Sequence, residues 1–288
     1  MSGPIGPEPT VDLHLHSTAS DGELSPEALV ARAAGAGLAA MALTDHDTVA
    51  GVPAAIAAGE RHGIRVIGGC EFSVAAPWGE MHVLGYFLPS DSRVLEDFLV
   101  ACRADRSRRG RAMVDRLHRL GLPLSEDDVL AEAEGAAVGR PHVARALLRK
   151  GLVGSIAEAF DRFLGRGRPA FVEKVLPSFA RVAALVHQVG GVVSAAHLKD
   201  RATRGLLLQL RAEGLDAVET RHPSHDPDLR ARLTDLALEL DLLRTGGSDW
   251  HGDPMEDETH GAIGSQQVPL AWLERLEAAR RLPAPTSP

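Results

Sequence analysis

Cysteine is scarce in this sequence, and long apolar runs are missing from it. The chain of 288 residues has two cysteines, Cys70 and Cys102, too few for a disulfide framework or a thiolate metal site. No run of about 18 apolar residues is present to span a membrane. The N-terminal residues lack the basic and apolar segments of a signal peptide. We therefore expect a soluble, cytoplasmic protein.

Basic residues are outnumbered, with 31 Lys and Arg against 39 Asp and Glu and a formal net charge of −8. An acidic chain is poorly suited to coating nucleic acid, so we expect no large nucleic-acid surface. Locally arranged cations or bound metal ions can still attract an anionic ligand. Hydrophobic residues make up 44% of the chain, enough for one large α/β domain or two modest ones.

Strand-like and helix-like runs alternate over residues 10–91 and again over 169–282. In the first such unit, Ser25 has the character of a helix N-cap and Pro26 that of a first helical residue. The alternation predicts a parallel sheet covered by helices. Residues 92–168 show helical patterns only, which predicts an all-helical insertion between the two halves of the α/β domain.

Imidazoles and carboxylates occur at the ends of almost all the predicted strands. His14 and His16 fall on one face of a strand, because side chains alternate along it. In α/β barrels and sheets the functional site lies at the carboxyl ends of the strands. A single such residue is usually a loop or cap group, but this repetition indicates a site for more than one metal ion. Its candidate residues are His14, His16, Asp45, His46, Asp47, Glu71, His82, His197, Glu219, His222, Asp249 and His251.

Other histidines and a basic segment have simpler interpretations. His62, His118 and His187 lie in predicted helices and are expected to be surface or packed residues. His260 follows an acidic loop and is expected to be solvated. The segment 103–111 (RADRSRRGR) is typical of a solvated helix face, although it would attract a second phosphate or a short RNA if it faced the cleft.

Eight short motifs spread over residues 12–251 resemble one known family. They are DLHLHSTASDG, LTDHDT, GCEFS, MHVLGY, GRPH, AAH, VETRHPSH and GSDWH. The set resembles the PHP-domain (polymerase and histidinol phosphatase) metallophosphoesterases. GRPH and HPSH are most similar to the subgroup that acts on 3′,5′-bisphosphorylated nucleosides such as pAp, some members of which trim short 5′-phosphorylated RNA. The resemblance implies an α/β fold, a distorted (β/α)7 barrel of the PHP type with an all-helical insertion.

The resemblance also implies three divalent metal ions in a cleft at the strand ends. Manganese suits a ligand set of His and carboxylates, and zinc, iron and magnesium are alternatives. A hydroxide held by the metal ions would be the attacking group. The implied ligands are His14, His16, Glu71 and Asp249 for one ion; Glu71, His82 and His197 for a second; and Asp21, His46 and His251 for a third.

Arg140 in GRPH is the expected fixed phosphate contact, because guanidinium binds phosphate in a bidentate way. The alternative is a capping or surface arginine. His142 would assist Arg140 or orient the start of its helix. His222 would assist catalysis or hold a metal ligand, and His222 and His225 are both expected to contact the substrate.

One loop departs from the subgroup pattern, since Leu198 stands where a proline is usual. Lys199 or Arg201 would take the place of the usual arginine and contact phosphate. The expected substrate is a phosphorylated nucleotide or a short RNA, and the expected state is a monomer. Alternatives are another PHP phosphomonoesterase, such as one for histidinol phosphate, a PHP exonuclease for longer nucleic acids, and a non-catalytic metal-binding module.

Overall fold

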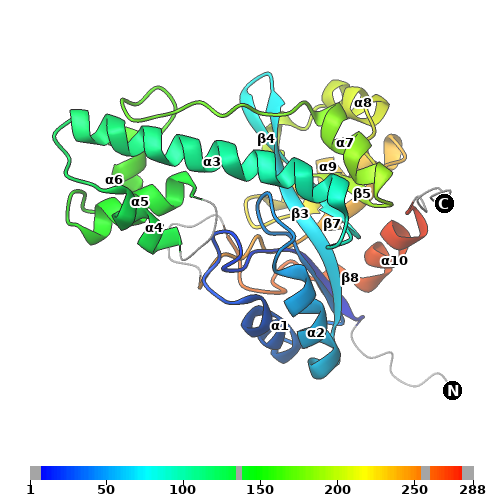
Figure 1. Ribbon diagram of the computed structural model, residues 1–288. Helices are drawn as coiled ribbons and strands as arrows, with labels where there is room; N and C mark the ends of the chain where they lie inside the picture. Colours follow the sequence, from blue (N-terminus) through cyan, green and yellow to red (C-terminus); the bar gives the residue numbers. More distant parts are fainter. Residues whose placement is uncertain (1–7, 134–137, 254–259, 281–288) are drawn as a thin grey trace, which may run out of the picture.

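The structure is a computed structural model that describes residues 8–133, 138–253 and 260–280 (Figure 1). Its centre is an eight-stranded sheet with the strand order β7-β6-β5-β4-β3-β2-β1-β8. Beyond β7, the chain runs beside β1, where the Asp249 N–H donates to the His14 carbonyl at 2.9 Å. The sheet thus curls into a nearly closed barrel. Its strands are β1 Thr10–Leu15, β2 Ala40–Leu43, β3 Arg65–Ala76, β4 Gly79–Tyr86, β5 Val192–Ala195, β6 Ala217–Arg221, β7 Leu243–Gly246 and β8 Val268–Pro269.

The strand directions confirm the α/β barrel but correct the prediction of a parallel sheet. Strands β1, β2 and β3 are parallel, as are β5, β6 and β7. Strand β4 is antiparallel to both β3 and β5. The reason is the connection after β3, because Ala76 pairs with Gly79 and leaves only Pro77 and Trp78 to make the turn. Two residues can close a hairpin but cannot form a parallel crossover.

Within the described residues, six helices lie around the barrel, as can be followed in Figure 1. Ser25 caps the first of them as predicted, its hydroxyl accepting from the Ala28 N–H at 3.2 Å. A 3-10 turn, η2, spans Lys199–Arg201 directly after the loop that follows β5. The helices are α1 Pro26–Gly35, α2 Val52–His62, α7 Phe179–Gln188, α8 Arg204–Ala212, α9 Pro227–Glu239 and α10 Leu270–Ala278.

A helical segment separates β4 from α7, and its described residues contain no strand. The long helix α3, Arg93–Arg119, leads from the barrel to a group of short helices on one side of the molecule (Figure 1). These helices enclose an apolar cluster of their own, which includes the buried Met113, Leu117, Val143 and Leu147. They are α4 Glu126–Ala133, α5 Arg140–Arg149, α6 Ile156–Ala159 and the π-helix η1 Phe160–Leu164.

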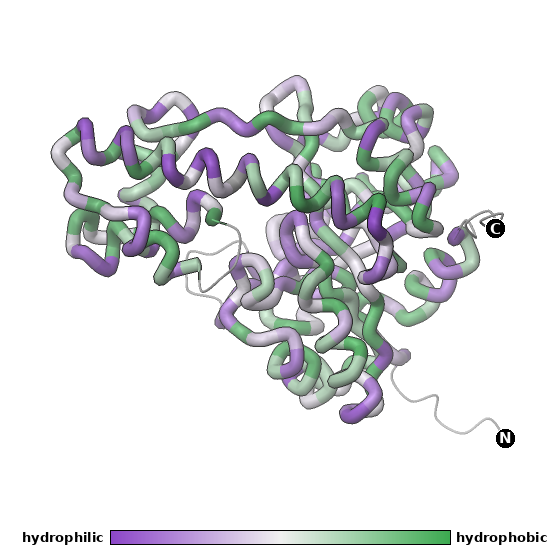
Figure 2. Tube along the Cα trace, in the orientation of Figure 1, coloured by the Kyte–Doolittle hydropathy of each residue, from purple (hydrophilic) through white to green (hydrophobic). Residues whose placement is uncertain are grey.

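Hydrophilic residues occur along much of α3 (Figure 2), and segment 103–111 lies within it. The prediction that this segment is a solvated face is wrong for Arg109, which is 2% exposed. Its Nε lies 3.1 Å from Asp105 Oδ2. Arg109 is buried because it faces residues 174–177, with which it lines a cavity of about 500 Å³.

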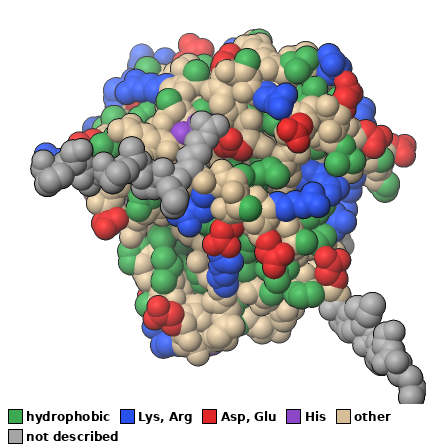
Figure 3. All heavy atoms as spheres, turned by 90° about the vertical axis from the view of Figure 1, so that its right-hand side faces the viewer, with side chains coloured by type: hydrophobic (Ala, Val, Ile, Leu, Met, Phe, Trp, Pro, Cys, Tyr) green, Lys and Arg blue, Asp and Glu red, His purple; other side chains and the backbone are tan. Residues whose placement is uncertain are grey.

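Basic and acidic side chains are interspersed over the described residues of the face shown in Figure 3. None of the described helices is both long enough and apolar enough to cross a membrane.

Candidate metal centre

A cleft of about 630 Å³ opens at the carboxyl ends of the barrel strands. Imidazoles and carboxylates from the barrel form one wall, and residues of α5, α6 and η1 form the other. The barrel residues that line it include Asp21, His46, Glu71, His82, His197, His222, Asp249, His251 and His260; the helical segment contributes Pro141, Arg145, Leu148, Ile156 and Phe160.

Glu71 lies at the centre of the imidazole cluster, on β3. Its Oε2 is 3.2 Å from the Nε2 atoms of both His14 and His16, which share one face of β1 and are fully buried. Its Oε1 is 2.9 Å from His82 Nδ1 and 3.1 Å from His197 Nε2. The two oxygens of Glu71 therefore face separate groups of imidazoles, the arrangement of a carboxylate that can bridge two cations.

Asp249, in the loop after β7, is a second carboxylate whose two oxygens face different imidazoles. Its Oδ1 lies 3.2 Å from His14 Nε2 and 3.3 Å from His16 Nε2. Its Oδ2 lies 3.2 Å from both His222 Nε2 and His260 Nδ1. His260 was expected to be solvated, and that prediction is wrong, because its ring lines the cleft beside Asp249.

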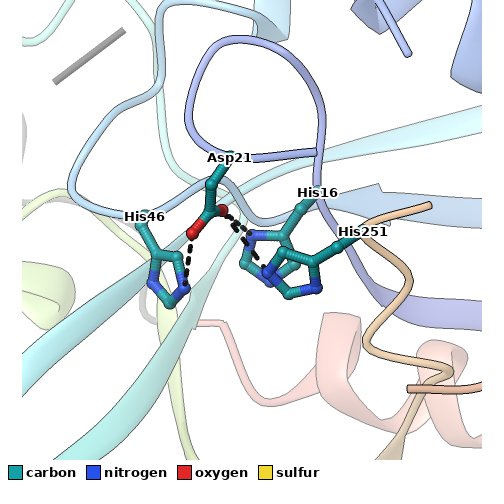
Figure 4. A group of neighbouring side chains, drawn as sticks. All are labelled: His16, Asp21, His46 and His251. Atoms are coloured by element: carbon teal, nitrogen blue, oxygen red, sulfur yellow. Dashed lines mark ion pairs between the residues drawn. The ribbon is translucent and has the colours of Figure 1, made fainter. Parts of the chain in front are cut away.

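Asp21 lies at the edge of the cluster, near three imidazoles. Its Oδ1 is 3.8 Å from His16 Nδ1 and 3.4 Å from His251 Nε2, and its Oδ2 is 3.9 Å from His46 Nε2. Figure 4 shows these four side chains pointing toward one another. Donor atoms of the four residues all lie within 4.8 Å of each other. The spacing leaves room for one cation among them.

Several of the buried polar atoms in the cluster make no hydrogen bond within the described part of the chain. They include His14 Nε2, both ring nitrogens of His16, Asp21 Oδ1 and Asp249 Oδ1. Leaving a buried polar group unsatisfied costs about 1–3 kcal/mol. A divalent cation accepts lone pairs from imidazole nitrogen and carboxylate oxygen alike, and such a ligand set without thiolate suits manganese, iron or zinc. The residues present therefore fit metal ions.

The electrostatics of the cluster favour bound cations. Burial disfavours the charged form of His16, but Asp249 and Glu71 outweigh it and raise the pKa of His16 to about 10. Burial is likewise outweighed at His82, where Glu71 and Glu80 raise the pKa to about 9. Conversely, despite burial, the neighbouring histidines hold the pKa of Glu71 well below its usual range. Concentrated carboxylate charge therefore attracts protons or metal ions to this site.

Glu219 holds two of the candidate ligands in place from behind. Its Oε1 accepts from His14 Nδ1 at 3.1 Å, and its Oε2 accepts from the His197 N–H at 2.7 Å. Such partners fix the tautomer and orientation of a ligating imidazole. Its position at the end of β6 made it a candidate from the sequence, but this supporting role was not predicted.

Backbone strain is concentrated in the loops that carry the site. His197, Lys199 and Asp249 have φ values of 27°, 54° and 52°, in the left-handed region. Residues in such conformations persist where the surrounding structure holds them, and they cluster at functional sites. The strain here turns His197 and Asp249 toward the cluster.

The nine predicted metal ligands all come together at this cluster. Of the predicted substrate contacts, His222 and Lys199 line the same cleft, whereas Arg140 lines a neighbouring cavity. Arg145, which was not singled out from the sequence, lies one helical turn beyond Pro141 and also lines the cleft.

His142 and His225 are placed away from the cleft. His142 is buried and its Nδ1 accepts from the Gly139 N–H at 2.9 Å, so it caps the start of α5. His225 is also buried, and its Nδ1 lies 3.4 Å from the Thr220 carbonyl oxygen. Burial lowers the pKa of His225 to about 4. The geometry thus gives both rings structural partners and brings neither of them to the cleft.

The barrel, with a cluster of imidazoles and carboxylates at its strand ends, defines a metal-dependent hydrolase. The chain belongs to the PHP domain family, whose pattern matches residues 12–219. It is 36% identical over 245 residues to a 5′-3′ exoribonuclease of Haemophilus influenzae, covering 83% of this chain and 89% of the relative. It is 30% identical over 249 residues to a 3′,5′-nucleoside bisphosphate phosphatase of Chromobacterium violaceum, covering 84% and 87%.

A solved structure shares the whole architecture. A candidate metal-dependent phosphoesterase of Bifidobacterium adolescentis superposes with a TM-score of 0.86 at 32% identity, covering 94% of this chain and 96% of its own. The predicted family, barrel fold and enzyme class are thereby confirmed. The chain is a metal-dependent phosphoesterase.

Proposed function

We propose that this enzyme hydrolyses the phosphate of 3′,5′-bisphosphorylated nucleotides such as pAp, and also trims short 5′-phosphorylated oligoribonucleotides. The observation that carries the proposal is the cluster around Glu71, whose carboxylate oxygens lie 2.9–3.2 Å from four imidazole nitrogens beside a cleft of nucleotide size. The names of the two relatives support the choice of substrate.

Three divalent metal ions, with manganese preferred, would occupy the cluster. His14, His16, Glu71 and Asp249 would hold the first ion, and their donor atoms lie within 4.8 Å of one another. Glu71 would share the second with His82 and His197, and the third would lie among Asp21, His46 and His251. Bound ions of this kind lower the pKa of water and neutralise phosphoryl oxygens.

The second phosphate of a bisphosphate needs a separate basic contact, for which Arg140 is well placed. Its Nη2 lies 3.8 Å from Glu80 Oε2, and Glu80 Oε1 lies 3.3 Å from His82 Nε2. Glu80 thus lies between Arg140 and His82, a residue of the metal cluster. The rings of Phe160 and Phe171 lie 5.9 and 5.8 Å from its guanidinium carbon and orient it.

His222 and Lys199 complete the substrate contacts on the barrel side. His222 is buried, with Nε2 at 3.2 Å from Asp249 Oδ2 and Nδ1 at 2.8 Å from Ser224 Oγ. These partners hold the ring at the wall of the cleft, where it can donate a proton or a hydrogen bond. Lys199 supplies a positive charge to phosphate.

A phosphate-release assay tests the proposal. The protein is freed of metal with a chelator, reloaded with Mn²⁺, and assayed with pAp, 3′-AMP, 5′-AMP and histidinol phosphate. We expect kcat/KM for pAp to exceed that for each monophosphate by at least tenfold, because only pAp has a second phosphate to bind. Equal or faster hydrolysis of histidinol phosphate would instead assign the chain to the other phosphomonoesterases of this family.

A further inference from the structure

A second, smaller cavity adjoins the metal centre on the barrel side. Its volume is about 240 Å³, and its walls include His82 and His197, which also line the main cleft. We call it the hairpin cavity, because the turn between β3 and β4 forms its outer wall. Its lining residues are Trp78, Glu80, Met81, His82, Ala196, His197, Leu198, Lys199 and Arg201.

The outer wall is an aromatic ring covered by a guanidinium group. The Arg201 guanidinium carbon lies 5.5 Å from the centre of the Trp78 ring. The Trp78 indole N–H donates to the Glu80 carbonyl at 2.9 Å, and Arg166 Nη1 donates to the Trp78 carbonyl at 2.5 Å. These hydrogen bonds fix the turn and the ring. Aromatic chains contribute only 4% of this sequence, yet one of them lies beside the metal centre in a preorganised position.

The charge of the hairpin cavity is suited to phosphate. Lys199 and Arg201 both line it, and neither has a carboxylate partner within 4 Å among the described residues. Glu80 also lines the cavity, and its carboxylate forms an ion pair with Lys174. Two cationic side chains therefore line a cavity that adjoins the metal centre, in a chain whose net charge is −8.

The reaction proposed above requires an additional binding site when the substrate is an oligonucleotide. Water adds through its oxygen to phosphorus, the bond from phosphorus to the 3′ oxygen breaks, and a proton of the water ends on that oxygen. In a 3′,5′-bisphosphate the reacting phosphate carries no further ester. In an oligoribonucleotide it also carries the 5′ oxygen of the next nucleoside. That next nucleotide needs a place beside the metal centre that a bisphosphate leaves empty.

We propose that the hairpin cavity binds this next nucleotide, an inference that rests on the proposed function. Lys199 and Arg201 contact the phosphate on the 3′ side of this nucleotide, because the phosphate on its 5′ side is the reacting one. The base of the nucleotide stacks on the layer formed by Arg201 and Trp78. Proteins that bind single-stranded nucleic acid commonly stack bases on aromatic rings or guanidinium planes. The cavity thus determines whether the enzyme acts on oligonucleotides in addition to mononucleotides.

The test compares two substrates, pAp and a 5′-phosphorylated triadenylate, with the Mn²⁺-loaded protein. In Trp78→Leu and in Arg201→Ala, kcat/KM for the trinucleotide should fall roughly 5- to 100-fold more than that for pAp, mainly through KM. Arg211→Ala is the matched control. Arg211 is an exposed residue of α8 whose partner is Asp241, and its loss should leave the ratio of the two substrates unchanged.

Fluorescence gives a second readout that does not depend on turnover. The chain has three tryptophans, and Trp250 and Trp272 are buried. Metal-free protein should therefore show quenching of Trp78 by the trinucleotide but not by pAp, and Trp78→Leu should lose this signal. Substrate ratios within twofold of wild type in both variants would overturn the inference, as would a wild type that hydrolyses pAp but not the trinucleotide. A wild-type protein that hydrolyses neither pAp nor the trinucleotide would instead refute the proposed function.

Discussion

The barrel and the helical segment face the same cleft with different chemistry. The barrel wall consists largely of imidazoles and carboxylates, and His14 and His16 behind it are fully buried. The helical wall carries four residues without a titratable group and one arginine, Arg145. Under the proposed function, the barrel carries the reacting centre and the helical segment contacts the rest of the substrate. Substitutions on the two walls should therefore have separable effects on metal binding and on substrate choice.

The largest effect is expected on the barrel wall, at Glu71. Glu71→Gln removes the charge that faces five imidazoles. It should lower kcat/KM about a thousandfold, because the stabilisation by bound metal amounts to several kcal/mol. Metal content should fall with it, as measured by mass spectrometry of the purified variant. Glu213→Gln, at a partly exposed carboxylate that follows the last residue of α8, is the control. A Glu71→Gln protein with unchanged metal and activity would refute the role given to this residue.

The helical segment should behave differently, at Arg140 in the cavity next to the cleft. Arg140→Ala should reduce kcat/KM for pAp by roughly 10- to 150-fold, the effect of losing a charge-assisted contact of about 1.5–3 kcal/mol. Metal content should not change, and a small aryl phosphate too short to reach α5 should be hydrolysed nearly as well as by wild type. An equal loss on both substrates would move Arg140 to the reacting phosphate, and no loss on either would leave it a surface residue.

A smaller effect is expected behind the barrel wall. Glu219→Gln keeps the shape of the side chain but weakens its hold on His14 Nδ1 and the His197 N–H. Metal affinity should fall about 10- to 100-fold, as for other partners of ligating histidines. Titration with Mn²⁺ followed by calorimetry measures this, and saturating metal should restore most of the activity. If saturating metal restored none of it, Glu219 would have to act in the reaction itself.

The smallest effect is the pH dependence of metal binding. Without metal, His16 has a pKa of about 10 and His82 of about 9, so both rings carry protons at neutral pH. A metal ion requires the neutral ring, so its binding must release protons. Below these pKa values, the affinity for metal should therefore fall by about tenfold for each unit by which the pH is lowered and for each proton displaced. The competition between protons and metal should vanish above pH 10. Calorimetry in two buffers of different ionisation enthalpy counts the released protons, and a count of zero at pH 7 would contradict this account.

The strand ends could be predicted from the sequence because the barrel is built from local patterns. Ser25 and Pro26 mark the start of α1, and the alternation in β1 turns His14 and His16 to one side. The direction of β4 could not be predicted by the alternation of strands and helices, because it depends on how few residues join it to β3. The signal was present in the short turn at Pro77 and Trp78.

The residues that sequence reasoning misplaced owe their positions to tertiary packing. His260 follows an acidic stretch of the sequence, and only the tertiary structure brings its Nδ1 to 3.2 Å from Asp249 Oδ2. His225 belongs to the same HPSH motif as His222, but its ring is buried, with Nδ1 3.4 Å from the Thr220 carbonyl oxygen. Arg109 lies in a charged helix and is nevertheless buried. None of these outcomes is visible in local periodicity, because each depends on segments distant in the chain or on the path of a loop.

The central claim is that metal ions held around Glu71 make the barrel wall catalytic. The most direct measurement is a Mn²⁺ titration of the chelator-treated protein in which bound metal and phosphate release from pAp are recorded together, with Glu71→Gln in parallel. We expect no release without metal, activity that rises as up to three ions bind, and little metal or activity in the variant. Full turnover by metal-free protein would contradict it.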